Sequence, residues 1–129
     1  YGDHRDLHSF PTRRSSDLLG TDTACPFVTH YDMWRELQYF HKYVGVSRAF
    51  ALYTATGRNA EIAGISAETG RIEAGKSADF LVTAANPLED LSALRTPCLV
   101  VARGRIFKNP KVKKNAVCER ALDKCFAEN

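Results

Sequence analysis

The residue of this chain most suited to chemistry is Asp22. Leu19 and Gly20 precede it, and Thr21 and Thr23 flank it, so an apolar approach and a glycine lead to a carboxylate between two hydroxyl groups. This pattern is typical of a buried strand that ends in a site, where a carboxylate can bind a divalent metal ion or transfer protons. The threonines could orient the carboxylate by hydrogen bonds, although strand propensity accounts for them equally well. Taken alone, an Asp after Gly-Thr is more often a turn or cap residue.

The histidines and cysteines add little to this site. His30 lies in the loop after Asp22 and could contact a substrate or pack at the start of the following helix. His41 lies at the edge of an apolar helix face, where a packing or surface role is favoured over metal binding. A zinc knuckle is unlikely and a disulfide framework is unsupported, because no Cys-x-x-Cys spacing occurs. The four cysteines are Cys25, Cys98, Cys118 and Cys125.

The first residues of the chain differ in kind from the rest. Residues 1–18 (YGDHRDLHSFPTRRSSDL) can be back-translated, in one open frame, into a widely used sequencing-library adapter that they therefore resemble. Segments of this kind are set aside before fold reasoning. We expect residues 1–18 to be an adapter-derived artefact and not native, so His4 and His8 are given no chemical role. The alternative is a natural polar arm rich in Arg and Ser.

Composition limits the remaining residues, 19–129, to one small domain at most. The formal net charge is +3 for the whole chain, with 18 Lys and Arg against 15 Asp and Glu, and stays +3 without residues 1–18, which hold three of each sign. A small net charge spread over both signs predicts no nucleic-acid partner. No apolar run approaches the roughly 20 residues that a membrane helix needs, which predicts no membrane partner. Thiols without a disulfide pattern favour a cytoplasmic location.

A helix is predicted after the loop that follows Asp22. Apolar side chains recur at helical spacing between residues 31 and 44, around polar ones such as Arg35. Thr29 or Asp32 could cap the start of this helix, and Gly45 is expected to end it.

A second helix and three short strands are predicted further along. Ser47 is expected to cap the second helix, which is followed by a further helical turn at 59–63. Strands are expected within 78–83, at 99–101 and at 105–107, with a hairpin or bulge at the glycine before the last. Asp79 is expected to bond local backbone at the entrance of the first of these strands.

These elements do not make a standard compact fold. A single strand at 19–22 has no neighbour to satisfy its backbone groups. The aromatic residues Trp34, Phe40 and Phe50 require more apolar surface than the elements offer. The chain is therefore interpreted as the end of a larger protein. Its basic stretch and helix at 108–129 are expected to be a surface tail that packs on something else.

Three motifs of the chain belong together: 19–23 (LGTDT), the pairs Ala55-Thr56 and Asn59-Ala60, and 70–82 (GRIEAGKSADFLV). In combination they resemble the C-terminal part of the metal-dependent amidohydrolase superfamily, in particular its imidazolonepropionase-like and dipeptidase-like members. The resemblance runs from Leu19 to about Phe107. It implies an α/β fragment that holds the last βα unit of a (β/α)8 TIM barrel and the C-terminal strands of a small β-sandwich. The implied divisions are 19–66 for the barrel end, 67–107 for the sandwich strands and 108–129 for the tail.

The resemblance also implies an activity. Members of the superfamily hydrolyse a carbon–nitrogen bond, in an amide or cyclic amide, with a metal-activated water. Asp22 would be the acid at the end of the last barrel strand, both a metal ligand and the general acid/base. The implied cofactor is a divalent metal, namely one or two zinc ions. The implied partners are a small-molecule substrate and, for the intact enzyme, further copies of itself in a homo-oligomer.

The other ligands of such a site would lie upstream of Leu19, so Asp22 alone is assigned to it, with His30 as a candidate for substrate binding. We expect the chain as given to be inactive, because one carboxylate cannot build a metal site that needs three or more ligands. The alternative hypothesis is a non-catalytic binding module of helices and strands.

Overall fold

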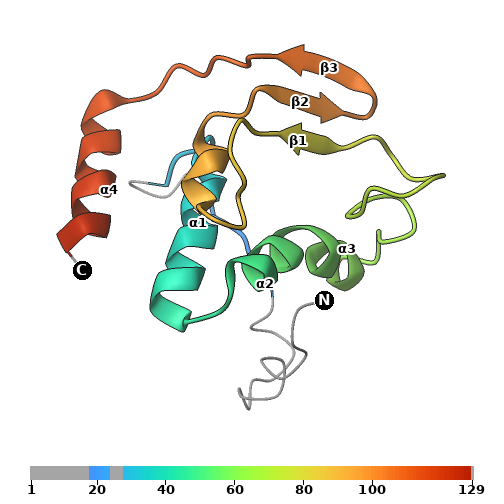
Figure 1. Ribbon diagram of the computed structural model, residues 1–129, viewed down its shortest axis with the longest axis horizontal. Coiled ribbons are helices and arrows are strands. Elements are labelled where there is room, and N and C mark those ends of the chain that lie inside the picture. The colour runs from blue at the N-terminus through green and yellow to red at the C-terminus, as the bar shows by residue number, and fades with distance from the viewer. Residues whose placement is uncertain (1–17, 24–27, 129) are drawn as a thin grey trace.

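The computed structural model describes residues 18–23 and 28–128 (Figure 1). Apart from Leu18, the adapter-like segment lies outside the described residues. A small sheet lies along one side of the molecule, helices lie below it, and the last helix lies at one end (Figure 1). The helices are α1 Met33–Tyr39, α2 Arg48–Tyr53, α3 Asn59–Ile62 and α4 Ala116–Glu128. The strands are β1 Phe80–Val82, β2 Leu99–Ala102 and β3 Arg105–Lys108.

The predicted end of the first helix at Gly45 and the predicted cap of the second at Ser47 are confirmed. A π-helical segment, Phe40–Val44, continues α1 until Gly45, whose φ of 80° and N–H bond to the His41 carbonyl oxygen end it. Ser47 caps α2 by accepting a hydrogen bond from the Phe50 backbone N–H at 3.1 Å. The start of α1 differs from the expectation. Asp32 occupies the cap position, but its carboxylate makes no capping bond.

The helices after Ser47 form one continuous rod. A π-helical segment, Thr54–Arg58, joins α2 to α3. A separate 3-10 helix, Leu91–Arg95, follows β1.

The buried core lies between α1, α2 and the 3-10 helix, at Leu37, Ala51 and Leu91. Partly buried apolar side chains pack around it, among them Leu19, Met33, Phe40, Val46, Leu52, Ala55 and Leu94.

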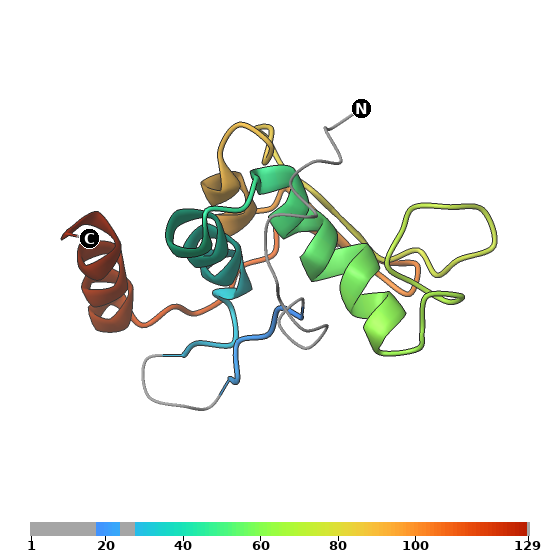
Figure 2. The same cartoon turned by 90° about the horizontal axis from the view of Figure 1, so that it is seen from below.

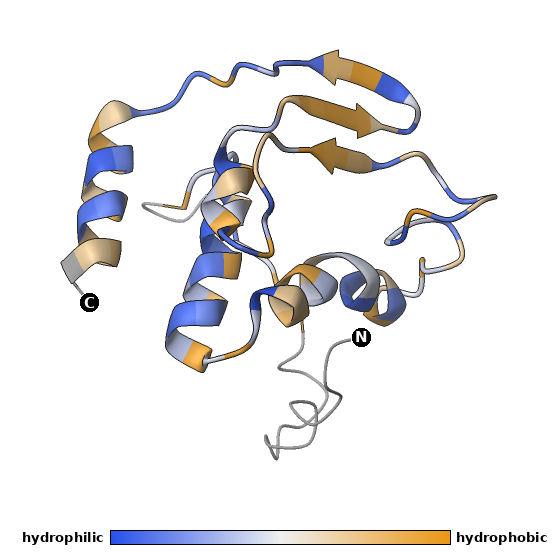
Figure 3. Cartoon of the chain, viewed as in Figure 1, coloured by the Kyte–Doolittle hydropathy of each residue, from blue (hydrophilic) through white to orange (hydrophobic). Residues whose placement is uncertain are grey.

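The sheet is antiparallel, in the order β1-β2-β3. Its register aligns Phe80 with Val101 and Val101 with Ile106. A two-residue turn joins β2 to β3, and both of its residues, Arg103 and Gly104, have positive φ, 49° and 75°. This is the backbone of a type I′ turn, which matches the twist of a hairpin. β1 and β2 are apolar along their length and β3 only in its middle, whereas the linker before α4 is largely polar (Figure 3).

Asp79 supports this turn. Its Oδ1 accepts a hydrogen bond of 2.6 Å from the Arg103 backbone N–H, and its Oδ2 accepts one of 3.1 Å from the Thr69 hydroxyl. The bond from Arg103 is the main reason that the pKa of Asp79 lies below its usual range. The predicted backbone bond is therefore made, but to a turn 24 positions further along the chain.

The strand expected before Asp22 is not formed in the structure. Residues 18–22 have no strand assignment, and Thr23 makes only an isolated bridge. A strand exists only where a neighbouring strand pairs with its backbone. At Leu19 both backbone groups bond instead to the side chain of Asn59, with N–H···Oδ1 at 3.1 Å and Nδ2–H···O at 2.7 Å.

Residues 63–79 form a long loop beside the sheet, at the end of the molecule opposite α4 (Figures 1 and 2). Ile72 is 88% exposed, so it belongs to no core within the described residues. Gly70 folds this stretch back onto α3. Its φ is 96°, and a Cβ there would lie 2.5 Å from the Cβ of buried Ala60.

Replacing Gly70 with Ala is expected to destabilise the protein by more than the same change at Gly75. Both residues have a φ near 90°, which costs about 1–2 kcal/mol for any residue with a Cβ. Only at Gly70 does the added methyl also collide with Ala60, which adds about 1–3 kcal/mol of overpacking. Urea denaturation of the two variants measures the difference. Equal free energies of unfolding would contradict the close approach.

The last helix, α4, packs on α1 within this chain. Its backbone lies away from that of α1, so long side chains make the contacts, and an extended linker joins it to β3 (Figure 2). Tyr39 on α1 and Phe126 on α4 have ring centroids 5.8 Å apart, and the Lys42 ammonium bonds to the Phe126 carbonyl oxygen. The expected surface tail thus has a docking partner in α1. Among the described helices, none is long and apolar enough to cross a membrane.

Candidate active site and comparison with known proteins

Asp22 lies in an irregular segment with its side chain exposed to solvent. Its backbone is left-handed, with a φ of 48°, a conformation that Asp tolerates better than most residues. The hydroxyl groups of Thr21 and Thr23 lie 2.7 Å apart and bond to each other. The carboxylate is therefore presented at the surface of this chain, on a segment that Asn59 holds at Leu19.

His30 is also exposed, and its ring meets Tyr31 edge to face with centroids 5.0 Å apart. Residues 24–27, between Asp22 and His30, lie outside the described residues. His41 has a structural contact, because its Nδ1 lies 2.7 Å from the Val46 carbonyl oxygen at the end of the helix. This agrees with the packing role predicted for it.

Among the described residues, no three His, Cys, Asp or Glu side chains come together in a group that could hold a metal ion. Asp22 therefore cannot form a metal site with its described neighbours alone. The thiols of Cys98 and Cys118 are likewise outside any such group.

A cluster of charges that the sequence did not reveal joins α1 to α4, and three of its members, Asp32, Arg35 and Glu119, are buried. Arg35 on α1 is only 4% exposed, and its Nη2 lies 2.9 Å from Asp123 and 3.5 Å from Glu119, both on α4. Arg95 reaches the same two carboxylates, at 2.8 Å from Glu119 and 3.1 Å from Asp123. Asp32 completes the set, 3.5 Å from the Nε of Arg35. We call these five residues the charge cluster.

The indole ring of Trp34 packs against both arginine side chains of this cluster. The guanidinium groups of Arg35 and Arg95 lie 4.7 Å and 5.3 Å from the centre of its ring, and its indole N–H donates to Asp32 at 3.0 Å. The Thr29 hydroxyl also donates to Asp32, at 2.6 Å. The cluster thus ties the end of the loop after Asp22 to the C-terminal helix.

The cluster shifts the pKa of Asp123 and the pKa of Asp32. Burial opposes ionisation of Asp123, but its contacts with Arg35 and Arg95 outweigh burial, and its pKa lies below the usual value. Burial opposes ionisation of Asp32 as well, and hydrogen bonds, including those from Thr29 and Trp34, again lower the pKa overall. Both groups are therefore ionised in the folded protein near neutral pH.

The stability of the protein is expected to fall in acid partly because of Asp123. A carboxyl group whose pKa is lower in the folded state binds protons more readily when unfolded, so its contribution is complete above the ordinary Asp pKa of about 3.9 and is lost below it. Asp123→Asn is expected to reduce the loss of unfolding free energy between pH 6 and pH 3. Urea titrations at both pH values test this. An unchanged loss in the variant would contradict it.

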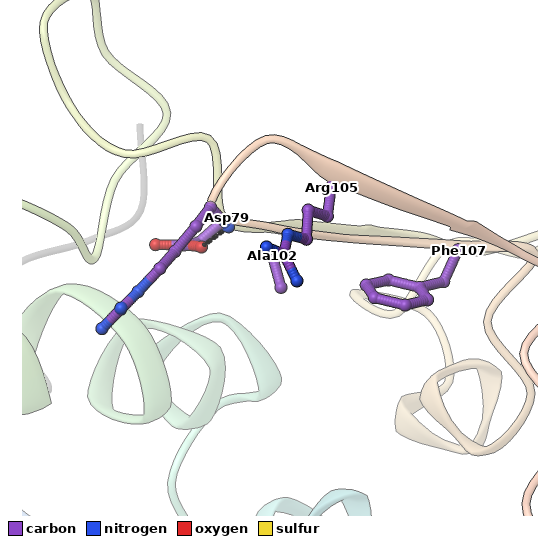
Figure 4. Close-up of a pocket in the computed structure, with 5 residues that line it drawn as sticks. Asp79, Ala102, Arg105 and Phe107 are labelled. Carbon is purple, nitrogen blue, oxygen red and sulfur yellow. Dashed lines mark hydrogen bonds between the residues drawn. The ribbon is translucent and has the colours of Figure 1, made fainter.

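An open pocket of about 600 Å³ lies at the β2–β3 hairpin (Figure 4). Asp79, Ala102, Arg103, Arg105 and Phe107 line it. The one carboxylate there is already bonded to the Arg103 backbone and to a neighbouring hydroxyl. The lining holds no histidine or cysteine, so this pocket lacks the groups that hydrolysis by a metal-bound water requires.

The sequence of this chain matches a known protein family. The sequence profile of the amidohydrolase family matches residues 7–107, a range that overlaps the adapter-like segment at 7–18. This match covers most of the chain, and the chain belongs to the amidohydrolase family. The family resemblance predicted from the three sequence motifs is confirmed.

Several solved structures are similar to this chain, among them the following two. The first is a candidate prolidase from Bifidobacterium longum, 49% identical, with a TM-score of 0.82 over 84% of this chain and 27% of that one. The second is a Xaa-Pro dipeptidase with methionine bound in its active site, 32% identical, with a TM-score of 0.56 over 59% of this chain and 18% of that one. The chain thus spans about a quarter or less of the length of these relatives. A search of curated proteins found no match.

Proposed function

We propose that this chain is the C-terminal part of a hydrolase that cleaves a carbon–nitrogen bond in a small substrate, with Xaa-Pro dipeptides as the first substrate class to test. The observation that supports this most is the 49% identity to a candidate prolidase over 84% of the chain. The name of the second relative, a Xaa-Pro dipeptidase, supports the same class.

In this proposal Asp22 is the general acid/base and one ligand of a divalent metal ion, zinc in one or two copies. An exposed carboxylate can accept a proton from an attacking water and return it to the leaving amine. A bound divalent ion would supply water that ionises near neutral pH. Because the described residues lack a group of metal ligands, the other ligands would come from elsewhere in the enzyme. His30 remains a candidate for substrate contact.

The exposed surface of the sheet supports a larger parent protein. Leu81 and Phe107 lie in one cross-strand row, and Ile106 lies in the next row and so on the opposite face. All three are at least half exposed, although antiparallel strands normally bury one face. Large exposed apolar patches mark surfaces that pack on other protein. We propose that 19–66 is the end of the barrel, that 67–107 belongs to a β-sandwich, and that the sheet packs on the rest of that enzyme.

The full-length enzyme, assayed on a substrate panel, tests the proposal. We expect hydrolysis of Xaa-Pro dipeptides to exceed that of other dipeptides, N-acetyl amino acids and cyclic imides, to stop after chelation, and to return with zinc. The isolated 129-residue chain, as the matched control, is expected neither to bind zinc stoichiometrically nor to hydrolyse any of them. Absence of all hydrolysis in the metal-loaded full-length enzyme would favour a non-catalytic binding module instead.

A further inference from the structure

The side chain of Asn59 bonds to the backbone of Leu19, in the segment that carries Asp22. Its Nδ2 donates to the Leu19 carbonyl oxygen at 2.7 Å, and its Oδ1 accepts from the Leu19 backbone N–H at 3.1 Å. The two residues are 40 positions apart. The amide thus satisfies both backbone groups of one residue, as a neighbouring β-strand would. We call this pair of bonds the Asn59 clamp.

Two bonds constrain more than one does. A single hydrogen bond leaves the backbone free to rotate about it, whereas a pair made by one planar amide sets position and orientation together. The side chain of Leu19 adds a third point of attachment, because it packs against the core cluster of Leu37, Ala51 and Leu91. The segment is therefore held by its backbone and by its side chain just three residues before Asp22.

The element that carries the clamp is itself firmly placed. Asn59 is the first residue of α3, which continues the rod that begins at Ser47. The next residue, Ala60, is 4% exposed and lies beneath Gly70. A rigid helix is a better support for a reacting group than a loop, because small displacements of that group cost rate.

We propose that Asn59 is a positioning residue for Asp22. It acts through the Leu19 backbone and sets where the Asp22 carboxylate lies, without touching the substrate. This inference rests on the proposed function, in which Asp22 transfers the proton. It assigns a task to an asparagine that the sequence presented only as part of a family motif.

Three variants of the full-length enzyme test the proposal. Asn59→Leu keeps the approximate size of the side chain and removes both bonds of the clamp. Asn59→Asp keeps the acceptor for the Leu19 N–H and loses the donor. Thr56→Val is the matched control, because this hydroxyl on the same rod bonds to the Leu52 and Tyr53 carbonyl oxygens and not to Leu19.

Two quantities are measured for each variant: the hydrogen exchange rate of the Leu19 amide, and kcat and KM per folded molecule. Asn59→Leu is expected to speed exchange at Leu19 and to lower kcat about 10–100-fold, the usual cost of losing an outer support of a reacting group, with KM nearly unchanged. Asn59→Asp is expected to fall between Asn59→Leu and the wild type in both quantities. Thr56→Val is expected to leave both at the wild-type level. A purely structural role would lower the folded fraction without this graded loss of kcat.

The outcomes separate the possible failures. Unchanged exchange at Leu19 in Asn59→Leu would show that the clamp does not form in solution and would overturn the proposal. Faster exchange with an unchanged kcat, or an equal loss of kcat in Thr56→Val, would overturn the positioning role while leaving the clamp. If the wild-type enzyme hydrolyses none of the substrates, the proposed function fails and the positioning role fails with it, whereas Leu19 exchange still reports the clamp.

Discussion

Asp22→Asn in the full-length enzyme is expected to lower kcat by about 10²–10⁴-fold, because loss of a positioned acid/base costs that much. Asparagine has nearly the same shape and still forms hydrogen bonds, but it cannot accept and return a proton at neutral pH. The exposed position of Asp22 means that the substitution removes no packing from the described core. The variant is therefore expected to lose kcat while its free energy of unfolding stays close to that of the wild type.

Measuring the metal content of the same variant separates the two roles proposed for Asp22. A variant that keeps its metal but loses kcat has lost only the acid/base, whereas one that loses both has lost a ligand as well. Asp79→Asn is the matched control, because that carboxylate supports the hairpin turn. The control is expected to lower stability and to retain kcat. A kcat for Asp22→Asn within a few-fold of the wild type would remove Asp22 from the mechanism.

Arg35→Met is expected to lower the free energy of unfolding by about 3 kcal/mol, the lower end of the range for removing one partner of a buried ion pair. Methionine fills much of the space but leaves Asp32 and the 7%-exposed Glu119 without the Arg35 cation. The lower end applies because Arg95 still contacts Glu119, and because the side chain of Asp123 is 45% exposed. Urea denaturation at pH 7 measures the loss.

The control for this prediction is Arg120→Met on α4. Arg120 is exposed and bonds to a carbonyl oxygen within its own helix, so its loss is expected to change stability by no more than about 0.5 kcal/mol. Adding Glu119→Leu to Arg35→Met should recover part of the loss, because two apolar side chains can replace a buried ion pair at little cost. Equal losses for Arg35→Met and Arg120→Met would mean that the charge cluster does not hold α4 in solution.

Local signals in the sequence predicted most of the regular elements. Gly45 and Ser47 mark a helix end and a helix start because their backbone and capping preferences act within one turn of the chain. Gly104 marks the hairpin for a similar reason, since a two-residue turn with positive φ depends on its own residues. The motif around Asp22 and the glycine-rich motif before β1 helped to predict the family, because each is a short contiguous stretch that can be recognised without the fold.

The strand predicted at 19–22 shows the limit of such signals. The apolar approach, the glycine and the flanking threonines are typical of a strand end, but strand formation depends on a partner that the local sequence does not specify. Within the described residues the partner of Leu19 is the Asn59 side chain. The barrel unit that the resemblance implies therefore remains a prediction for the full-length enzyme.

What the sequence by itself determined is the family, the helix and hairpin boundaries, and Asp22 as the candidate reacting group. Only the tertiary structure decided that Arg35, on the polar side of its predicted helix, is buried, and that α4 docks on α1. The same holds for the Asn59 clamp. The physical reason is range: these contacts join residues 40 to 88 positions apart, as in Leu19–Asn59 and Arg35–Asp123, and leave no periodic trace in either segment. A buried charge becomes favourable only when folding brings its partners to it.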